Sequence, residues 1–398
     1  MKKPIAKKLL SLICAFIMLC LMMCSCEPSK QIESNNKYDD YGTYGVYYEH
    51  YGLDDIGYDH SYFSSILDML FSTVEDDYEY ERNYENSRKS GDFVIGDYYS
   101  EDYELEGVCI LDYMGSSKDV VIPEQVDGAD VVALGAYDLS YSYDDWVCQP
   151  FENTGFRSIT LPSTLKYIYY ETLSFGDAVY ISEQDKENYD ITLPESINVD
   201  PENEYFSSEN GILYSKDKTC LLNVPTNYQA DALTVPDSVE YIAEEAIVCE
   251  NIKRLNIGKN VIGINYPSCI FGKKLEQINV DKQNEYYSSN NGVLYNKDKT
   301  VLLNYPSMKQ DKSYTLPDTV ETVAANWGKV LNTEEIVFNE NIQECNIYEP
   351  PYAYSEYNAE GVAWYSSIKK ICGYRGTGFD EAVYNIRSSR DMDYEYLD

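Results

Sequence analysis

The feature that most constrains this chain is a long internal repeat. Residues 203–225, NEYFSSENGILYSKDKTCLLNVP, return almost unchanged at residues 284–306 as NEYYSSNNGVLYNKDKTVLLNYP. The same offset holds without a gap from Ile197 to Ile257, and more than half of the fifty positions that begin at Ile197 are identical. A gapless repeat favours stacked strands, because a slip of one residue would turn every buried side chain outward. The sequence therefore predicts repeated units that pack against their neighbours.

Short segments in which apolar and polar residues alternate recur from about Glu104 onward. Such alternation is typical of a strand with one buried face, and a proline at its end stops the hydrogen-bonded ladder. The segments are Val121-Ile122-Pro123, Ile159-Thr160-Leu161-Pro162, Ile191-Thr192-Leu193-Pro194, Leu233-Thr234-Val235-Pro236, Leu255-Asn256-Ile257, Tyr314-Thr315-Leu316-Pro317 and Ile336-Val337-Phe338. Val235 precedes Ile257 by 22 positions, as Leu316 precedes Phe338. This spacing falls in the range of about 20 to 29 residues that leucine-rich repeats use.

Each 81-residue block also contains an insertion, which the duplicated phrase spells out. GILY at residues 211–214 and CLLNVP at residues 220–225 are two short strand patterns joined by the polar SKDKT. This arrangement predicts a β-hairpin. Gly211 and its equivalent Gly292 are expected at a turn that a Cβ atom would forbid.

Three stretches share a pattern of apolar residue, proline, apolar residues three apart, a turn and a second strand: VPDSVEYIAEEAIVCENIKRLNI, LPSTLKYIYYETLSF and LPDTVETVAANWGKVLNTEEIVF. The pattern resembles the BspA-like bacterial leucine-rich repeats of surface proteins. ILDYMGSSKDVVIPEQVDGADVVALGAYDL looks like the first coil of that family, and IKKICGYRGTGFDEAVY looks like its final capping unit. The match covers about Glu104 to Tyr384, with a lapse from Tyr137 to Glu152.

The resemblance implies a mainly β fold, a right-handed leucine-rich-repeat solenoid with one short strand per coil, short helical turns and inserted β-hairpins. It also implies a scaffold for binding, because such coils are not built around an active site.

The first 25 residues are predicted to be a lipoprotein signal peptide. MKKPIAKK is basic, and the apolar run from Leu9 to Met23 is shorter than the about 20 residues that span a bilayer. MCSCEPS then resembles the lipobox of bacterial lipoproteins, which makes Cys26 the expected lipidation site and Cys24 the alternative acceptor. An uncleaved N-terminal anchor is the other interpretation. Both place the body outside the cytoplasm, attached to the outer face of the bacterial cell membrane.

The rest of the chain divides into three segments. Residues 26–103 are predicted to be an acidic, Tyr-rich tether, because aliphatic residues are too few to offset chain entropy. One amphipathic helix is expected within it at about residues 60–82, where apolar residues fall at helical spacing. The repeat solenoid occupies residues 104–384, with the two copies at about 197–264 and 278–345. Residues 385–398 form an acidic C-terminal tail.

The charge balance limits the partners. Asp and Glu outnumber Lys and Arg by 68 to 31, which gives a formal net charge of −37. Nucleic acid and anionic lipid surfaces both require basic side chains and are therefore excluded as direct partners. A neutral partner, a basic partner or one bridged by divalent cations remains. The alternative interpretation is that the acid merely keeps an exported protein soluble and monomeric.

Histidine content argues against an enzyme. The only two histidines, His50 and His60, lie in the predicted tether. This removes Ser-His-Asp and Cys-His nucleophile systems and His-based zinc sites from the repeat body. Carboxylate pairs remain, but an open strand face lacks the enclosed pocket that raises the pKa of one member. We therefore expect no catalytic residues and no enzymatic activity.

The cysteines are expected to be buried hydrophobic residues. Seven follow Cys26, and no Cys-x-x-Cys spacing occurs among them. In the alignment of the two copies Cys220 corresponds to Val301, Cys249 to Val330, and Cys345 to Ile264. Exchange with β-branched residues favours this structural role over disulfides or reactive thiols.

No metal site or cofactor is predicted. The acid-rich phrases VDPENE (199–204) and VDKQNE (280–285) could hold a divalent cation. Capped turns are the favoured interpretation, because Asp and Asn bind nearby backbone amides. The loops around Lys216–Lys218 and Lys297–Lys299 carry both signs of charge and make poor calcium ligands.

The predicted function is a cell-surface-anchored leucine-rich-repeat binding protein that mediates protein–protein interaction or adhesion to a host or neighbouring cell. Alternatives are a cell-wall carbohydrate-binding lipoprotein and a passive structural spacer. Solenoids recognise partners over a continuous face. The candidate binding face consists of Ser158, Thr160, Thr192, Thr234, Arg254, Asn256, Gln277, Asn279, Thr315 and Glu335. A second candidate surface is the set of hairpin aromatics Tyr205, Phe206, Tyr286 and Tyr287. Packing of these aromatics onto the coil is the favoured interpretation.

Overall fold

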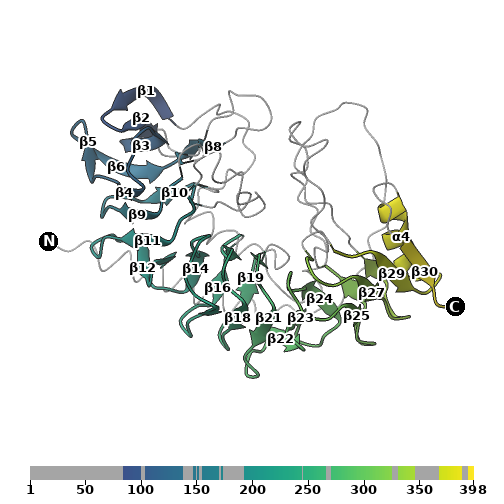
Figure 1. Ribbon diagram of the computed structural model, residues 1–398. Coiled ribbons are helices and arrows are strands. Elements are labelled where there is room, and N and C mark those ends of the chain that lie inside the picture. The colour runs from purple at the N-terminus through teal and green to yellow at the C-terminus, as the bar shows by residue number, and fades with distance from the viewer. Residues whose placement is uncertain are drawn as a thin grey trace, which may run out of the picture. The chain divides into compact units, whose positions relative to one another are not determined.

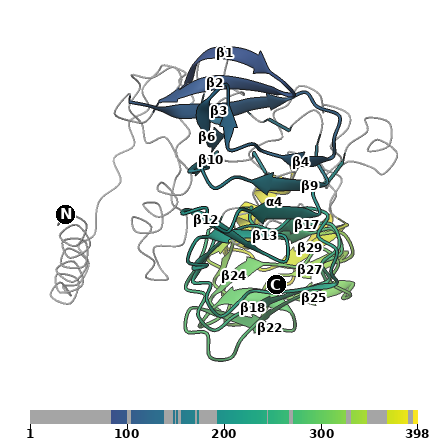
Figure 2. The ribbon, with the colours of Figure 1, turned by 90° about the vertical axis from the view of Figure 1, so that its left-hand side faces the viewer.

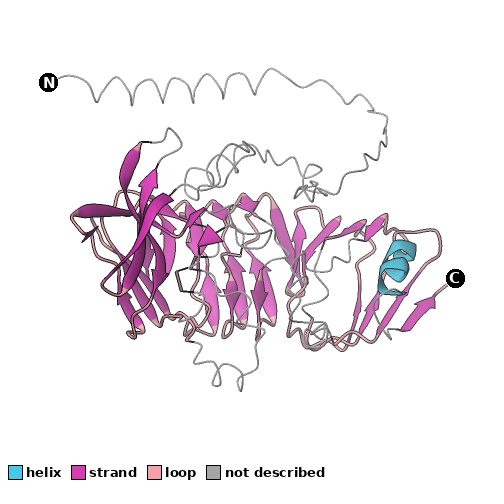
Figure 3. Ribbon diagram, turned by 90° about the horizontal axis from the view of Figure 1, so that it is seen from above, coloured by secondary structure: helices cyan, strands magenta, loops and turns pink. Residues whose placement is uncertain are grey.

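The computed structural model describes residues 84–99, 104–137, 147–148, 150–151, 155–169, 172–173, 192–243, 245–265, 270–324, 330–345, 367–387 and 393–398. The chain divides into two compact units, Met1–Glu49 and His50–Asp398, and every described residue belongs to the second. The predicted signal peptide, Cys26 and the helix expected at about residues 60–82 lie outside the described residues. Strands are the main regular structure of the described part, and its single α-helix is α4 (Phe379–Arg387) (Figure 3).

The first sheet combines a β-meander with parallel strands. Its strands pair in the order β1 (Tyr84–Ser90), β2 (Phe93–Tyr99), β3 (Leu105–Tyr113), β6 (Ala129–Leu134) and β10 (Tyr167–Ile168), and β5 (Gln125–Val126) pairs with β6. The pairs from β1 to β3 are antiparallel, whereas β6 lies parallel to β3 and to β10. Figure 2 shows β1, β2 and β3 side by side. The pair β7 (Ala136–Tyr137) and β8 (Val147–Cys148) is separate from this sheet.

The expected tether boundary at residue 103 is wrong for residues 84–99, which form β1 and β2. The reason is that tyrosine supplies part of the apolar surface that aliphatic residues lack here. Tyr84 and Tyr98 are buried in one hydrophobic cluster, and the Tyr98 hydroxyl lies 2.9 Å from that of Tyr169 in the same cluster. A tyrosine that buries its ring and shares its hydroxyl contributes as a core residue.

Three parallel ladders follow, and they carry most of the predicted strands. The first contains β4 (Asp119–Val121), β9 (Ser158–Leu161) and β11 (Ser196–Val199); the second contains β15 (Ala232–Thr234), β18 (Arg254–Ile257) and β21 (Gln277–Val280); the third contains β25 (Ser313–Thr315), β27 (Glu335–Val337), β29 (Lys370–Gly373) and β30 (Asp393–Tyr396). Leu233 pairs with Leu255 and Tyr314 with Ile336. In both ladders, these residues, which lie 22 positions apart in the sequence, are paired directly across neighbouring strands, as the predicted repeat length requires. Figure 1 shows β18 beside β21.

One predicted strand is misplaced. Residues 192–195 are irregular, and the ladder strand is β11, which begins at Ser196 after Pro194. The inward ladder position belongs to Ile197, which pairs with Ile159 and is fully buried. The proline rule failed here because Pro194 precedes its strand instead of ending it.

The duplicated phrase forms the same sheet twice. The first copy pairs β12 (Phe206–Glu209), β13 (Ile212–Ser215), β14 (Cys220–Asn223), β16 (Tyr241–Ile242) and β19 (Gly263–Ile264) in that order; the second pairs β22 (Tyr287–Asn290), β23 (Val293–Asn296), β24 (Val301–Asn304), β26 (Thr322–Val323) and β28 (Glu344–Cys345). The predicted hairpins β13–β14 and β23–β24 are confirmed, each with one further antiparallel strand before it. Gly211 and Gly292 both have positive φ, at 78° and 79°, as the turn prediction requires.

Each inserted meander covers the edge of a ladder. The backbone amide of Ile197 in β11 donates to the carbonyl of Gly211 at 2.8 Å, and that of Ile278 in β21 donates to Gly292 at 2.9 Å. The backbone amides of Val199 and Val280 donate to the hydroxyls of Ser208 and Ser289 in the meanders, at 2.9 and 3.0 Å. An uncovered ladder edge is a template for unwanted strand pairing, so the insertion also protects the sheet.

The expectation of one strand per coil is wrong in the coils that the structure describes. A second short parallel strand follows the ladder strand. Examples are β16 and β19 (Figure 1), which pair through Tyr241 and Gly263, and β26 and β28, which pair through Thr322 and Glu344. A further short parallel pair joins β17 (Val248–Cys249) and β20 (Phe271–Gly272). The segments at β16, β19 and β26 read VEYI, VIGI and VETV, and their β-branched residues favour a strand over a helical turn.

The predicted acidic tail is also partly folded. Helix α4 extends past residue 385, where the tail was expected to begin. Strand β30 pairs in parallel with β29 through residues 393–396. Phe379 of α4 is fully buried and packs against Tyr396 of β30, with ring centroids 5.6 Å apart. The end of the chain therefore closes the third ladder.

The buried cysteines behave as predicted. Cys220, Cys249 and Cys345 are fully buried free thiols in the two main hydrophobic clusters. Burial raises the pKa of Cys220 to about 12 and raises that of the other two still further above its ordinary range. Thiols held neutral in this way are poor nucleophiles.

Candidate binding face

The ten residues predicted for the binding face all lie at positions that are exposed or half-buried. Nine belong to ladder strands: Ser158 and Thr160 in β9, Thr234 in β15, Arg254 and Asn256 in β18, Gln277 and Asn279 in β21, Thr315 in β25 and Glu335 in β27. Thr192 is the exception, because its segment is not a strand. The neighbouring inward residues, such as Leu255 and Ile278, are fully buried. The inward and outward sides of these strands are thus as expected.

On the second ladder the outward residues bond to one another across the strands. Asn256 donates from Nδ2 to Oγ1 of Thr234 at 3.0 Å, and Asn279 donates from Nδ2 to Oδ1 of Asn256 at 3.1 Å. Each side chain is thereby fixed by its neighbour, which lowers the entropy that a partner would have to remove on binding. Arg254 and Gln277 lie in the adjacent outward row of the same strands and are exposed.

On the first ladder an acidic residue that sequence analysis missed organises the outward side. Asp119 of β4 accepts hydrogen bonds from Nε of Arg157 at 3.0 Å and from Oγ of Ser158 at 2.8 Å. The Arg157 guanidinium and then the Ser158 hydroxyl lower the pKa of Asp119. Ser158 alone was singled out from the sequence. Its partner could be found only once the register of β4 against β9 was known.

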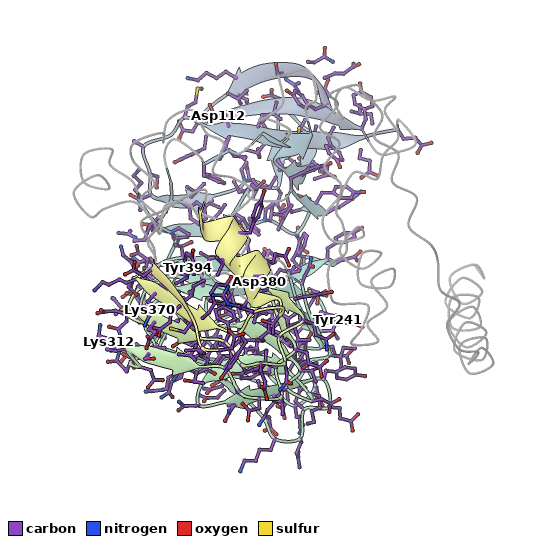
Figure 4. All side chains as sticks on the ribbon, turned by 90° about the vertical axis from the view of Figure 1, so that its right-hand side faces the viewer. Asp112, Tyr241, Lys312, Lys370, Asp380 and Tyr394 are labelled. Carbon is purple, nitrogen blue, oxygen red and sulfur yellow. The ribbon has the colours of Figure 1, made fainter. Side chains whose placement is uncertain are left out.

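On the third ladder, paired charges run across the strands. Glu334 lies between the ammonium groups of Lys312 and Lys369, at 3.3 and 2.7 Å, and Lys369 followed by Lys312 lowers its pKa. The pKa of Glu335 is lowered first by the Ser313 hydroxyl, 2.7 Å away. Figure 4 shows Lys312 and Lys370 on the same side of this ladder.

Lys370 extends the network to the last strand of the third ladder. Its ammonium lies 3.6 Å from Glu335 and also contacts Glu395 of β30. These contacts join β27, β29 and β30 by charge as well as by backbone pairing. Because both carboxylates remain accessible to solvent, their contribution to stability is small.

The hairpin aromatics separate into two kinds. Phe206 and Tyr287 are buried, so they are wrong as binding residues and correct as packing residues. The Tyr287 hydroxyl accepts a hydrogen bond from the backbone amide of Ile264 at 3.0 Å, and burial raises its pKa. Tyr205 and Tyr286 stay available, with 41% and 46% of their surface exposed.

Two buried asparagines, one in each copy, hold the turn before the meander, and the sequence analysis did not single them out. Asn203 donates from Nδ2 to the carbonyls of Pro162 and Leu165, both at 2.8 Å, and its Oδ1 accepts the amides of Tyr205 and Phe206. The sequence feature that could have identified them is the NEY phrase, which both copies contain. An asparagine that is identical in both copies beside buried positions indicates a structural amide.

Asn284 makes the same four bonds in the second copy. It donates to Gly258 at 2.9 Å and to Val261 at 2.8 Å, and it accepts from the amides of Tyr286 and Tyr287. The predicted capped turns are confirmed beside it: the backbone amide of Gln283 donates to Oδ1 of Asp281 at 2.8 Å.

Within the described residues, no group of three or more His, Cys, Asp or Glu side chains is placed to hold a metal ion. No helix in that part of the chain is both long enough and apolar enough to cross a membrane. The arrangement that the described residues do offer is an ordered, largely polar strand surface together with two exposed tyrosines.

No protein-family model and no curated protein sequence matches the chain. Solved structures that are similar to it include the following three. The pneumococcal vaccine antigen PcpA is 18% identical with a TM-score of 0.38, and the match covers 66% of this chain and 67% of that one. A leucine-rich repeat protein from Eubacterium ventriosum is 16% identical with a TM-score of 0.35, covering 74% and 72%. A leucine rich cell surface protein from Faecalibacterium prausnitzii is 14% identical with a TM-score of 0.31, covering 79% and 95%. The second and third are described as leucine-rich-repeat or leucine-rich cell surface proteins, the class that the sequence motifs also resemble.

Proposed function

We propose that the chain is a bacterial cell-surface protein that binds a protein on a host or neighbouring cell. The binding element is a right-handed leucine-rich-repeat solenoid, and its outward ladder side is the recognition surface. The observation that carries this proposal is the set of parallel ladders whose successive strands pair at a nearly constant spacing and carry an ordered polar outer row. A surface of repeated, pre-ordered side chains suits recognition over a continuous face.

The electrostatics of the ladders favour binding over catalysis. A general acid needs a carboxyl group whose pKa is raised toward the working pH. Asp119, Glu334 and Glu335 show the opposite shift, because each lies beside a hydrogen-bond donor or a cation that lowers its pKa. These groups stay ionised at neutral pH and suit contacts with basic or hydroxyl-bearing groups of a partner.

A glycan partner is the second candidate, and the exposed rings of Tyr205 and Tyr286 are the observation that favours it. An exposed aromatic ring offers an apolar face beside a polar hydroxyl, and sugar rings can stack on such a surface. The ladder side offers much more ordered polar surface than two rings do, so the protein partner is preferred.

The first prediction tests the ladder surface. Immobilised full-length protein should capture a reproducible partner from host or neighbouring bacterial cell surfaces. Arg254→Glu should reduce that capture about tenfold or more, because arginines are frequent binding hot spots and the substitution removes the hydrogen bonds of the exposed guanidinium. Quantitative capture followed by titration of the purified partner provides the measurement.

Lys259→Glu is the matched control for Arg254→Glu. It makes the same change of charge in the turn directly after β18, where Lys259 pairs with Asp237 at 3.1 Å. Capture that is equal for parent, Arg254→Glu and a Gln277→Ala variant would contradict a role for this face. Loss of partner capture in both Arg254→Glu and Lys259→Glu would mean that the change in net charge, and not the position of Arg254, causes the loss.

The second prediction concerns the membrane anchor. We propose that Cys26 is lipidated and becomes the N-terminal residue of the mature protein. Cys26→Ser should move the protein from the membrane fraction to the medium, because a multiply acylated cysteine gains about 0.8 kcal/mol for each buried methylene. Fractionation followed by immunoblotting measures the shift. Cys24→Ser should leave the protein on the membrane, and retention of both variants would indicate an uncleaved N-terminal helix.

A further inference from the structure

The two copies of the repeat agree most strongly in one segment. From Ile197 to Asn223, 20 of 27 positions are identical to their counterparts in the second copy. From Val224 to Ile257 only 9 of 34 are identical. Packing explains the agreement at buried positions such as Asn203 and Leu213. Agreement at exposed positions needs another reason.

Several exposed identities have a structural reason. The ammonium groups of Lys216 and Lys297 bind the carbonyls of Asn203 and Asn284, so both lysines fasten the turn. Asp217 accepts three bonds within its own loop, from the Ser215 hydroxyl and from the amide and hydroxyl of Thr219. These side chains are used by the fold itself.

The side chains of Glu204–Tyr205 and Glu285–Tyr286 make no comparable bonds within the fold. All four residues are exposed, and their side chains form no hydrogen bond or ion pair with any residue that the structure describes. The exposed positions just before them have changed between the copies, from Pro201-Glu202 to Lys282-Gln283. The dipeptide Glu-Tyr is therefore retained in both copies although its side chains form no hydrogen bond or ion pair within the described fold, and about two fifths of the surface of each tyrosine stays exposed.

The fold holds both tyrosines in fixed positions. The backbone amide of Tyr205 donates to Oδ1 of Asn203 at 2.8 Å, and that of Tyr286 donates to Oδ1 of Asn284 at 2.9 Å. The Tyr205 carbonyl also accepts the amide of Lys216 at 2.8 Å. A rigid exposed aromatic ring can bind a partner with little loss of entropy. The two sites lie at the starts of β12 and β22, which Figure 1 labels.

The same protein shows what a tyrosine beside a carboxylate can hold. The guanidinium carbon of Arg375 lies 3.8 Å from the ring centroid of Tyr396, and Nε of Arg375 is 4.0 Å from Oδ1 of Asp398. An arginine over an aromatic face with a nearby carboxylate combines a cation–π contact with an ion pair. Glu204–Tyr205 and Glu285–Tyr286 each carry an exposed carboxylate and a partly exposed ring on adjacent residues.

We propose that Glu204–Tyr205 and Glu285–Tyr286 are two equivalent sockets for arginine side chains on a basic segment of the partner protein. The inference rests on the proposed binding function and names the chemistry of the partner. The formal net charge of −37 attracts a basic segment to the surface, and the two rings then select arginine within it. Two sockets on one chain would engage one segment with two arginine groups and bind it more tightly than either alone.

The test uses the full-length protein and a synthetic peptide with two Arg-Arg pairs joined by a Gly-Ser linker. Calorimetry at physiological ionic strength should show that Tyr205→Ala and Tyr286→Ala each weaken binding about threefold to tenfold. The double variant should lose roughly the product of the two effects, because two separated sites contribute nearly additively. Neither substitution changes the net charge. A Lys-Lys version of the peptide should bind the parent more weakly, because lysine cannot stack its ammonium as arginine stacks its guanidinium plane.

Tyr384→Ala is the matched control, because Tyr384 is the most exposed of these tyrosines at 76% and lies in α4, outside both sockets. It should bind the peptide like the parent. The proposal is overturned if the parent does not bind the peptide, if the double variant binds like the parent, or if Tyr384→Ala loses as much. It is also overturned if soluble chito-oligosaccharides or dextran bind and only that binding depends on the two tyrosines.

The same partner-capture experiment distinguishes failure of the two arginine sockets from failure of the proposed ladder surface. If Arg254→Glu abolishes partner capture while the double tyrosine variant captures normally, the sockets are wrong and the ladder face stands. If the double variant loses the partner and Arg254→Glu does not, the sockets stand and the ladder face is wrong.

Discussion

Val320→Asp is expected to unfold the C-terminal part of the repeat body. Val320 is fully buried, and it belongs to the hydrophobic cluster that also contains Leu316, Val323 and Phe338. A charge placed there has no partner, and an unpaired buried charge costs several kcal/mol. That is a large part of the about 5 to 15 kcal/mol by which domains are stable. The urea midpoint followed by circular dichroism should fall sharply, or the transition should disappear.

Val239→Asp makes the equivalent change in the first copy, because Val239 is the counterpart of Val320 in the internal repeat and is also fully buried. Val239 belongs to the other, larger hydrophobic cluster. Hydrogen exchange should therefore show the loss of protection centred on different strands in the two variants. Local unfolding that is identical in both would contradict the separation of the two clusters.

Thr319→Asp and Ser238→Asp are the matched controls. Each introduces the same charge one residue earlier, at an exposed position. Ser238→Asp should change stability by less than about 0.5 kcal/mol, and Thr319→Asp by about 1 kcal/mol, because it also removes the exposed hydrogen bond from the Thr319 hydroxyl to the Lys299 carbonyl. If Val320→Asp melted with its control and with the parent, the inward orientation of Val320 would be wrong.

Alternation of apolar and polar residues was enough to place most ladder strands and to separate their inner from their outer side. Leu233, Leu255 and Ile336 are buried, whereas Thr234 and Arg254 are exposed, as the pattern predicts. The pattern predicts the wrong strand where a proline precedes a strand instead of ending it. Pro194 precedes β11, although the repeat that links Ile197 to Ile278 of β21 already pointed to the correct strand.

Tyrosine is the residue whose role the sequence could not settle. Its ring can be buried and its hydroxyl can be paired, or both can face solvent. Tyr295 and Tyr314 are buried with their hydroxyls bonded to one another, and burial raises the pKa of Tyr295 to about 12. Tyr205 and Tyr286 are exposed. Counting tyrosine as a surface residue is what led to the wrong tether boundary.

Contacts between coils also required the structure. Asp231 and Lys253 lie one coil apart and form an ion pair at 3.2 Å because β15 and β18 are neighbours. The length of the coil was visible in the sequence. The sequence did not show which acidic and basic side chains lie next to each other across the strands, because that depends on the register of each strand pair. Asp119 was missed as a partner of Ser158 for the same reason.

Asn284→Asp is expected to destabilise the second repeat by about 2 kcal/mol or more, because one buried and one partly buried carbonyl lose their donor and each unsatisfied buried group costs about 1 to 3 kcal/mol. The change keeps the size and shape of the side chain but replaces the Nδ2 donor by an oxygen. The carbonyls that lose their hydrogen bonds are those of Gly258 and Val261. The new oxygen also faces these two carbonyl oxygens, which adds repulsion. Chemical denaturation of the variant and the parent measures the difference.

Asn291→Asp is the control, because it makes the same substitution at an exposed turn residue with a φ of 50°, a conformation that Asp tolerates. It should change stability by less than about 0.5 kcal/mol. The pH dependence identifies the cause of the Asn284→Asp effect. Protonation restores one donor, so the folded variant binds that proton more tightly than the unfolded chain does. The deficit relative to the parent should therefore be smallest below about pH 4 and grow as the pH rises through the ordinary carboxyl range. A deficit that stayed constant with pH would mean that the amide acts through packing and not as a donor between neighbouring repeats.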